Sequence, residues 1–192
     1  FVAGAIFSGF AMVMTLLIPL RSIYGLEDFV TMRHLDNMAK VILATGTMMF
    51  YGYASEVFFA YYSGNEYERY LALNRALGPY AWSYWALIAC NIVTPQVLWF
   101  PRMRRSIPVL FMVALIVNVG MWLERFVIVV ISLHHDFLPS AWRMYYPTVW
   151  DFTHLVGSIG LFLTLLFLFI RLLPMISIFE LRALVHDTEE ES

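Results

Sequence analysis

Five long apolar runs, almost free of charged residues, constrain this 192-residue chain more than any other feature. They cover about residues 1–20, 38–62, 80–101, 106–133 and 151–173. Each run is long enough to cross a bilayer, because a helix needs about 20 residues to span a hydrocarbon core of about 30 Å. Open sheets cannot satisfy their backbone hydrogen bonds in lipid, and the runs lack the alternation of a membrane barrel. The sequence therefore predicts an all-α fold, a polytopic transmembrane helical bundle of about five helices.

The composition agrees with a membrane protein and limits its cofactors and partners. Charged residues make up 14% of the chain, against about 25% in soluble domains. A net charge of −2 gives no electrostatic case for a nucleic-acid partner. Cys90 is the single cysteine, which excludes an internal disulfide, a cysteine-based zinc site and a cysteine-ligated iron–sulfur cluster. We expect a buried free thiol at this position.

The connectors differ in character. Residues 21–37 carry mixed charges and are expected to form a short interfacial helix, and residues 63–79 begin and end with glycine signals. Residues 102–105 form a tight, arginine-rich link. The tail, residues 174–192, is amphipathic and then acidic, and is expected to be solvated. The chain opens at Phe1 without a basic region or cleavage site, so we expect it to begin partway through a longer protein.

Basic residues predict the orientation in the membrane. Eight lie in the odd connectors and the tail: Arg21, Arg33, Lys40, Arg102, Arg104, Arg105, Arg171 and Arg182. Only Arg69, Arg75 and Arg143 lie on the opposite side. The positive-inside rule therefore places the tail of this multi-pass protein in the cytoplasm and the second and fourth connectors outside, which is the periplasm where the membrane is a bacterial inner membrane.

Ionisable residues inside the apolar runs are the main candidates for chemistry, because each costs about 2.5–3.5 kcal/mol even on lenient insertion scales. They are Glu56, Glu124, Arg125, Asp151 and His154, all toward the predicted outer side. Carboxylates in a dry site and histidines can exchange protons near neutral pH, so the set predicts an outward proton path or the wall of a polar pocket. The alternative for Arg125 is an ion-pair clamp with a carboxylate of a neighbouring helix. Adjacent helix positions point about 100° apart, so Glu124 and Arg125 should serve different neighbours.

Secondary candidates flank this set: Tyr53, Asn91, His134, His135 and Asp136. Pro95 cannot donate to the carbonyl of Asn91, which predicts a kink in the third run. The consecutive residues His134, His135 and Asp136 are expected to be solvated interfacial groups, because adjacent loop residues seldom converge on one metal ion. We expect no metal site. With no second intramembrane histidine to match His154, we also expect no haem bound by this chain alone.

Three strings carry a resemblance to a known family. They are LDNMAKVILATGTMMFYGYASEVFFAYYSGNEYE (35–68), NRALGPYAWSYWALIACNIVTPQVLWF (74–100) and NVGMWLERFVIVVISLHHDFLPSAW (118–142). They resemble the NrfD/polysulfide-reductase-like membrane subunits, most closely the ActC subunits of bacterial alternative complex III. Full-length members have about ten helices in two bundles, and this chain is similar to the second half. The family's quinol-contacting His and Asp belong to the first bundle and have no counterpart here.

The resemblance implies a function and partners. It points to a subunit of a menaquinol-oxidising complex in respiratory or photosynthetic electron transport, with menaquinol or quinone as the substrate. Iron–sulfur and multihaem cytochrome c subunits and a second NrfD-like subunit would be its partners, and this chain would carry no redox cofactor. In that frame, Glu56, Glu124, Arg125 and Asp151 would form a proton path or the rear wall of the quinol pocket.

Two other functions stay open at this point. A proton- or ion-translocating subunit without quinol chemistry would also use membrane carboxylates, although it should carry them through the full depth. A structural anchor for peripheral redox subunits is the third possibility, although an anchor would not need Glu56 and Glu124.

Overall fold

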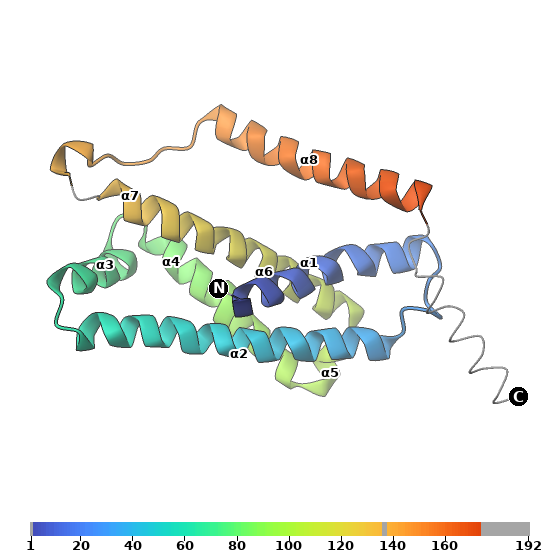
Figure 1. Cartoon of the computed structure of the whole chain (residues 1–192). Helices are drawn as coiled ribbons and strands as arrows, with labels where there is room; N and C mark the ends of the chain where they lie inside the picture. The colour runs from blue at the N-terminus through green and yellow to red at the C-terminus, as the bar shows by residue number, and fades with distance from the viewer. Residues whose placement is uncertain (1, 136–137, 174–192) are drawn as a thin grey trace, which may run out of the picture. The chain divides into compact units, whose positions relative to one another are not determined.

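The computed structural model describes residues 2–135 and 138–173, in which all regular secondary structure is helical and no strand occurs. The elements, shown in Figure 1, are α1 (Val2–Ile23), α2 (Met32–Tyr62), α3 (Glu66–Leu77), α4 (Ala81–Ile88), the π-helix η1 (Ala89–Val93), the 3₁₀-helix η2 (Thr94–Trp99), α5 (Pro101–Arg104), α6 (Ile107–Phe126), the π-helix η3 (Val127–Ile131), α7 (Ser132–His134), the 3₁₀-helix η4 (Pro139–Ala141) and α8 (Val149–Leu172). The predicted all-α class is confirmed.

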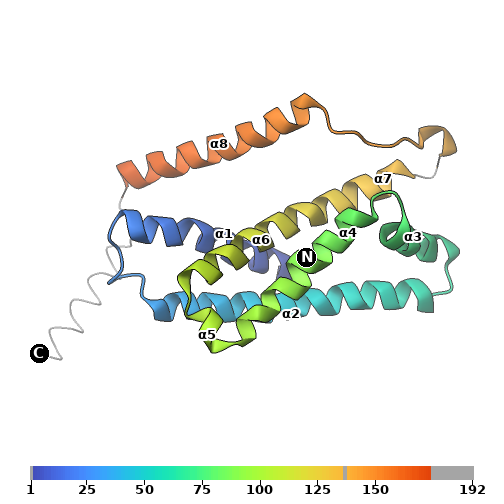
Figure 2. The same ribbon diagram turned by 180° about the vertical axis from the view of Figure 1, so that it is seen from behind.

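The chain divides into two compact units, residues 1–143 and residues 144–192. The first unit is a bundle in which α1, α2, α4 and α6 lie side by side, as the two opposite views in Figures 1 and 2 show. The short helix α3 packs on α2 and α4 at one end of the bundle, and α5 packs on α2 and α6 toward the other. We call these the α3 end and the α5 end. The second unit contributes α8.

The core of the first unit lies between α1, α2 and α6. Large buried residues such as Phe7, Ile42 and Leu110 interdigitate there with small ones such as Ala39 and Ala114. Lipid tails are as apolar as these side chains, so close van der Waals packing rather than the hydrophobic effect holds such helices together. Small residues let the backbones approach, which favours a tight bundle.

The third apolar run is not one regular helix. Regular α4 gives way to the π-helix η1 and then to the 3₁₀-helix η2, which contains Pro95. Pro95 has no backbone N–H to donate, so the α-helical ladder fails around it. Side chains replace part of the ladder: Thr94 Oγ1 donates to Ala89 O at 2.9 Å, and Gln96 Nε2 donates to Ile92 O at 3.1 Å. The predicted break at Pro95 is confirmed.

The prediction of a separate interfacial helix over residues 21–37 is wrong. Residues up to Ile23 complete α1, and α2 already begins at Met32, where His34 accepts from the backbone N–H of Thr31. Charged residues at the start of α2 extend the helix past its apolar stretch. Conversely, residues 63–79 contain the twelve-residue α3, which the glycine signals had marked only as a connector.

Three helical stretches of the described chain are long and apolar enough to cross a membrane: Val2–Ile23, Ile107–His134 and Val149–Leu172. The polytopic membrane fold is therefore supported directly at three positions. The third run is interrupted by η1 and η2, and α2 carries charges in its first turns. Both remain predicted spans on the strength of their sequence.

Candidate functional site

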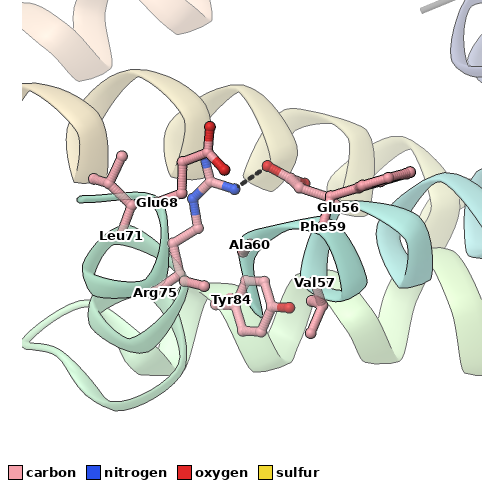
Figure 3. Close-up of a pocket in the computed structure, with 9 residues that line it drawn as sticks. Glu56, Val57, Phe59, Ala60, Glu68, Leu71, Arg75 and Tyr84 are labelled. Atoms are coloured by element: carbon pink, nitrogen blue, oxygen red, sulfur yellow. Dashed lines mark hydrogen bonds and ion pairs between the residues drawn. The ribbon is translucent and has the colours of Figure 1, made fainter. Parts of the chain in front are cut away.

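A pocket of about 320 Å³ opens at the α3 end, between α2, α3 and α4. It is lined by Glu56, Val57, Phe59, Ala60, Glu68, Leu71, Ala72, Arg75 and Tyr84 (Figure 3). The apolar lining comes from helix faces that pack together, and the polar lining combines two carboxylates with a guanidinium. Apolar pockets with a few convergent polar groups are the usual form of a small-molecule site.

An ion pair spans the pocket. Arg75, on the last turn of α3, donates through Nη1 to Glu56 Oε1 on α2 (Figure 3). The Arg75 side chain is only 20% exposed, and its buried Nε has no hydrogen-bond partner in the described chain. The sequence had suggested Arg125 as a cation for the carboxylates of neighbouring helices. Glu56 instead forms an ion pair with Arg75, a residue that the sequence places in a connector.

Glu68 contributes the second carboxylate of the pocket. Its Oε2 accepts from Ser63 Oγ at 2.9 Å, and Figure 3 shows its side chain beside Arg75. A neutral hydroxyl does not balance a carboxylate charge, so Glu56, Glu68 and Arg75 together leave the pocket with an excess of negative charge when all are ionised. Glu68 was not among the predicted site residues, although its position on an amphipathic segment between two apolar runs was a usable signal.

A second polar contact lies one turn along α2 from Glu56. Tyr53 donates through its hydroxyl to Glu124 Oε2 on α6 at 2.7 Å. That distance is typical of a strong hydrogen bond to a carboxylate. Tyr53 and Glu56 are three residues apart and so share a face of α2. The structure thus brings together three of the predicted residues, from α2 and α6.

Asn91 lies deeper in the bundle, within the π-helix η1. Its side chain is fully buried, and Nδ2 is 3.5 Å from Met121 Sδ, while Oδ1 has no partner in the described chain. The side chain fits because the facing residue on α6 is Gly120. Single π-helical turns within α-helices occur frequently at functional sites, and a buried amide oxygen without a partner is costly.

His134 is buried, so the expectation that it is a solvated interfacial group is wrong. Its side chain is 4% exposed, packs edge-on against Tyr80, and bonds through Nδ1 to the carbonyl of Ile131 at 2.8 Å. His135 is partly exposed, with Nδ1 3.0 Å from the Tyr70 hydroxyl and its ring stacked on Trp142. Asp136 lies outside the described residues. The described residues contain no group of three metal-binding side chains.

The remaining candidates behave differently. Asp151 caps α8: its Oδ2 accepts from the backbone N–H of Thr148 at 2.7 Å and from its hydroxyl at 2.8 Å. His154 and Ser158 lie on the same face of α8 as Asp151. Arg125 has an exposed side chain on α6.

These features define a class of protein: a polytopic helical membrane protein whose paired ionisable residues gather at one end of an apolar bundle. Residues 1–135 match the family model described as polysulphide reductase, NrfD, and the chain belongs to this family. NrfD proteins are membrane subunits of quinol-oxidoreductase-type enzyme complexes. The match covers the whole described bundle up to His135 and ends before α8. A comparison with curated proteins finds no match.

Proposed function

We propose that this chain is a membrane subunit of a menaquinol:electron-acceptor oxidoreductase of the alternative complex III type. Its own residues accept and release protons at the α3 end, which the arginine count predicts to face the periplasm. The observation that carries this proposal is the pocket lined by Glu56, Glu68 and Arg75, in which Arg75 pairs with Glu56. Membership of the NrfD family supplies the quinol context.

The chemistry requires groups of this kind. Oxidation of a quinol to a quinone releases two electrons and two protons, so a quinol site needs proton acceptors beside it. In this proposal, the electrons pass to iron–sulfur and haem groups of partner subunits. A carboxylate can accept a proton and release it to water at the pocket mouth.

Tyr53 and Glu124 extend the same system into the bundle. A tyrosine hydroxyl can both donate and accept a hydrogen bond, so Tyr53 can pass a proton between the Glu56 side of α2 and Glu124 on α6. The hydrogen bond of 2.7 Å provides one step of such a relay. Arg75 pairs with Glu56 and holds its carboxylate in place.

The test replaces Glu56 by Gln in the intact complex and measures menaquinol oxidation with an electron acceptor. We expect turnover to fall about a hundredfold, at the lower end of the usual contribution of general acid–base groups, because Glu68 lines the same pocket. Glu66→Gln, an exposed carboxylate on the same helix as Glu68 and outside the pocket lining, is the matched control and should keep wild-type turnover.

A double variant separates chemistry from clamping. If Glu56 served only to pair with Arg75, Glu56→Gln/Arg75→Gln would regain most of the activity, since no unpaired charge remains. Our proposal expects the double variant to stay as slow as Glu56→Gln. Wild-type turnover in Glu56→Gln, with the complex fully assembled, would contradict a proton role and favour a structural anchor.

The number of protons released per menaquinol tests the alternative that the subunit translocates protons across the membrane. In sealed vesicles, quinol chemistry alone releases two protons per menaquinol on the outer side. A larger yield that Glu124→Gln abolishes would favour translocation through the bundle.

A further inference from the structure

Three arginines crowd the turn between the third and fourth apolar runs, at the α5 end, and they have different surroundings. Arg104 is an internal clamp: its Nε donates to Asp36 Oδ1 at 2.9 Å, and its Nη1 donates to the carbonyl of Leu98 at 2.9 Å. Its side chain is 16% exposed. Arg104 therefore fixes α5 against the start of α2 and has little capacity left for an external ligand.

Arg102 and Arg105 are both exposed. Neither side chain makes a hydrogen bond or ion pair with another described residue. The neighbouring carboxylate, Asp36, is already bonded to Lys40 at 2.6 Å and to Arg104. The turn thus presents two guanidinium groups whose charge no nearby acid of the described chain balances. A guanidinium is a planar fork of N–H donors whose geometry matches the oxygens of a phosphate.

The same turn also presents large apolar side chains. Trp99 is 59% exposed, Phe100 is 65% exposed, and Met103 lies on α5 between the arginines with an exposed side chain. Trp99 donates through Nε1 to Gln96 Oε1, which holds the indole at the end of the apolar run. Tryptophan at such a position is typical of the boundary between lipid headgroups and hydrocarbon. Cations and apolar rings therefore meet at one membrane boundary.

We propose that this turn binds an anionic phospholipid, with its phosphate held by Arg102 and Arg105 and its first acyl segments lying against Trp99 and Phe100. The leaflet is the one at the α5 end, cytoplasmic by the arginine count. The site is independent of the proposed quinol chemistry, which involves the α3 end. Combined apolar and cationic contacts distinguish a phospholipid from free phosphate, which would use the guanidinium groups alone.

The test uses the purified complex in detergent and compares phosphatidylglycerol with phosphatidylcholine of the same acyl chains. Bound lipid is counted by native mass spectrometry, and the thermal midpoint is followed as lipid is added. We expect wild type to retain phosphatidylglycerol preferentially and to be stabilised by it. Arg102→Gln/Arg105→Gln should weaken this binding about thirtyfold, since each basic residue near an anionic surface contributes a factor of about five.

Two further variants test whether the position of the charge and the shape of the guanidinium group matter. Arg69→Gln/Arg143→Gln removes the same charge from exposed arginines elsewhere in the chain and should bind lipid like wild type. Arg102→Lys/Arg105→Lys keeps the charge but loses the fork, and should recover part of the binding. Since neither side chain makes a hydrogen bond or ion pair with a described residue, the Gln variant should fold normally.

Three results would overturn the proposal. Equal retention of the two lipids by wild type would show that there is no anionic site. Equal stabilisation by inorganic phosphate would show that the site binds a free anion. Binding of phosphatidylglycerol only after removal of residues 187–192 would show that the acidic end of the chain, rather than lipid, is the natural ligand of this turn.

Discussion

Gly120 occupies a position on α6 where the structure has no room for a side chain. A Cβ added there would lie 2.1 Å from Asn91 Oδ1 and 2.6 Å from Cys90 Cβ, whereas ordinary contacts begin at 3.4 Å. Relief of both contacts requires α6 and η1 to separate by roughly an ångström. Asn91 would also shift away from Met121, its present partner at 3.5 Å.

Gly120→Ala should therefore destabilise the bundle strongly. Overpacking of a close-packed interior typically costs 1–3 kcal/mol, and the upper end applies because one obstacle is a Cβ atom, which cannot move without its backbone. For a chain of about this size, about 3 kcal/mol lowers the thermal midpoint by about 6–12 °C. The measurement is thermal unfolding of the purified protein in detergent, with and without the substitution.

The control is Gly52→Ala on α2, where an added Cβ meets nothing within 4 Å. Alanine favours helix over glycine, so this variant should equal or slightly exceed wild type in stability. Adding Asn91→Ala to Gly120→Ala removes the closest contact but leaves Cys90 Cβ, so about half of the loss should be recovered. A Gly120→Ala midpoint within a degree of wild type would refute the close approach of α6 to the π-helix.

Two other predictions follow from single contacts. Tyr53→Phe removes the donor to Glu124, and should cost about 1–2 kcal/mol of stability and slow menaquinol oxidation, whereas Tyr51→Phe, exposed on the same helix, should leave both unchanged. At the α5 end, the hydrogen bond from Lys40, and next that from Arg104, hold the pKa of Asp36 below its ordinary value of 3.8. The stabilisation from Asp36 is therefore complete above about pH 4 and lost as pH falls through the lower pKa of the folded state. Asp36→Asn should cost about 1 kcal/mol at neutral pH and progressively less below pH 4, and a difference constant from pH 7 to 3 would contradict this linkage.

The positions of the long helices could be predicted from sequence because lipid imposes a length and forbids unpaired backbone groups. Their ends could not, because an apolar run marks the hydrocarbon depth rather than the length of a helix. α2 begins six residues before its apolar run, since the charged residues from Arg33 onward continue the helix toward the aqueous side. The kink at Pro95 could be foreseen from the missing N–H. The form of the kink, a π-helix followed by a 3₁₀-helix, could not be foreseen. It involves a tertiary contact, since Asn91 in the π-helix packs against Gly120 of α6.

The candidate site shows a similar boundary between what sequence can and cannot predict. The cost of a charge in lipid singled out Glu56 and Glu124 before their surroundings were known. Their partners could not be predicted, because helical periodicity says which residues share a face and not which helix covers it. Arg75 reaches Glu56 only because α3 folds back over α2, and His134 is buried only because the end of α7 turns it toward Tyr80.

The distribution of polar groups through the first unit bears on which function they serve. From the α3 end, Glu56, Tyr53 and Glu124 lead inward, and Asn91 lies deeper. Beyond Asn91, the spanning segments contain no acidic, basic or histidine side chain until Lys40 and the Asp36–Arg104 clamp at the opposite end. The hydroxyls in between, such as Thr45, bond to carbonyls of their own helix and so are poor proton carriers. A conductor across the whole membrane would need groups at that depth. The arrangement instead favours exchange of protons with one side, as quinol oxidation requires, while the opposite end of the bundle is built from arginines that fix α5 and, in our proposal, bind lipid.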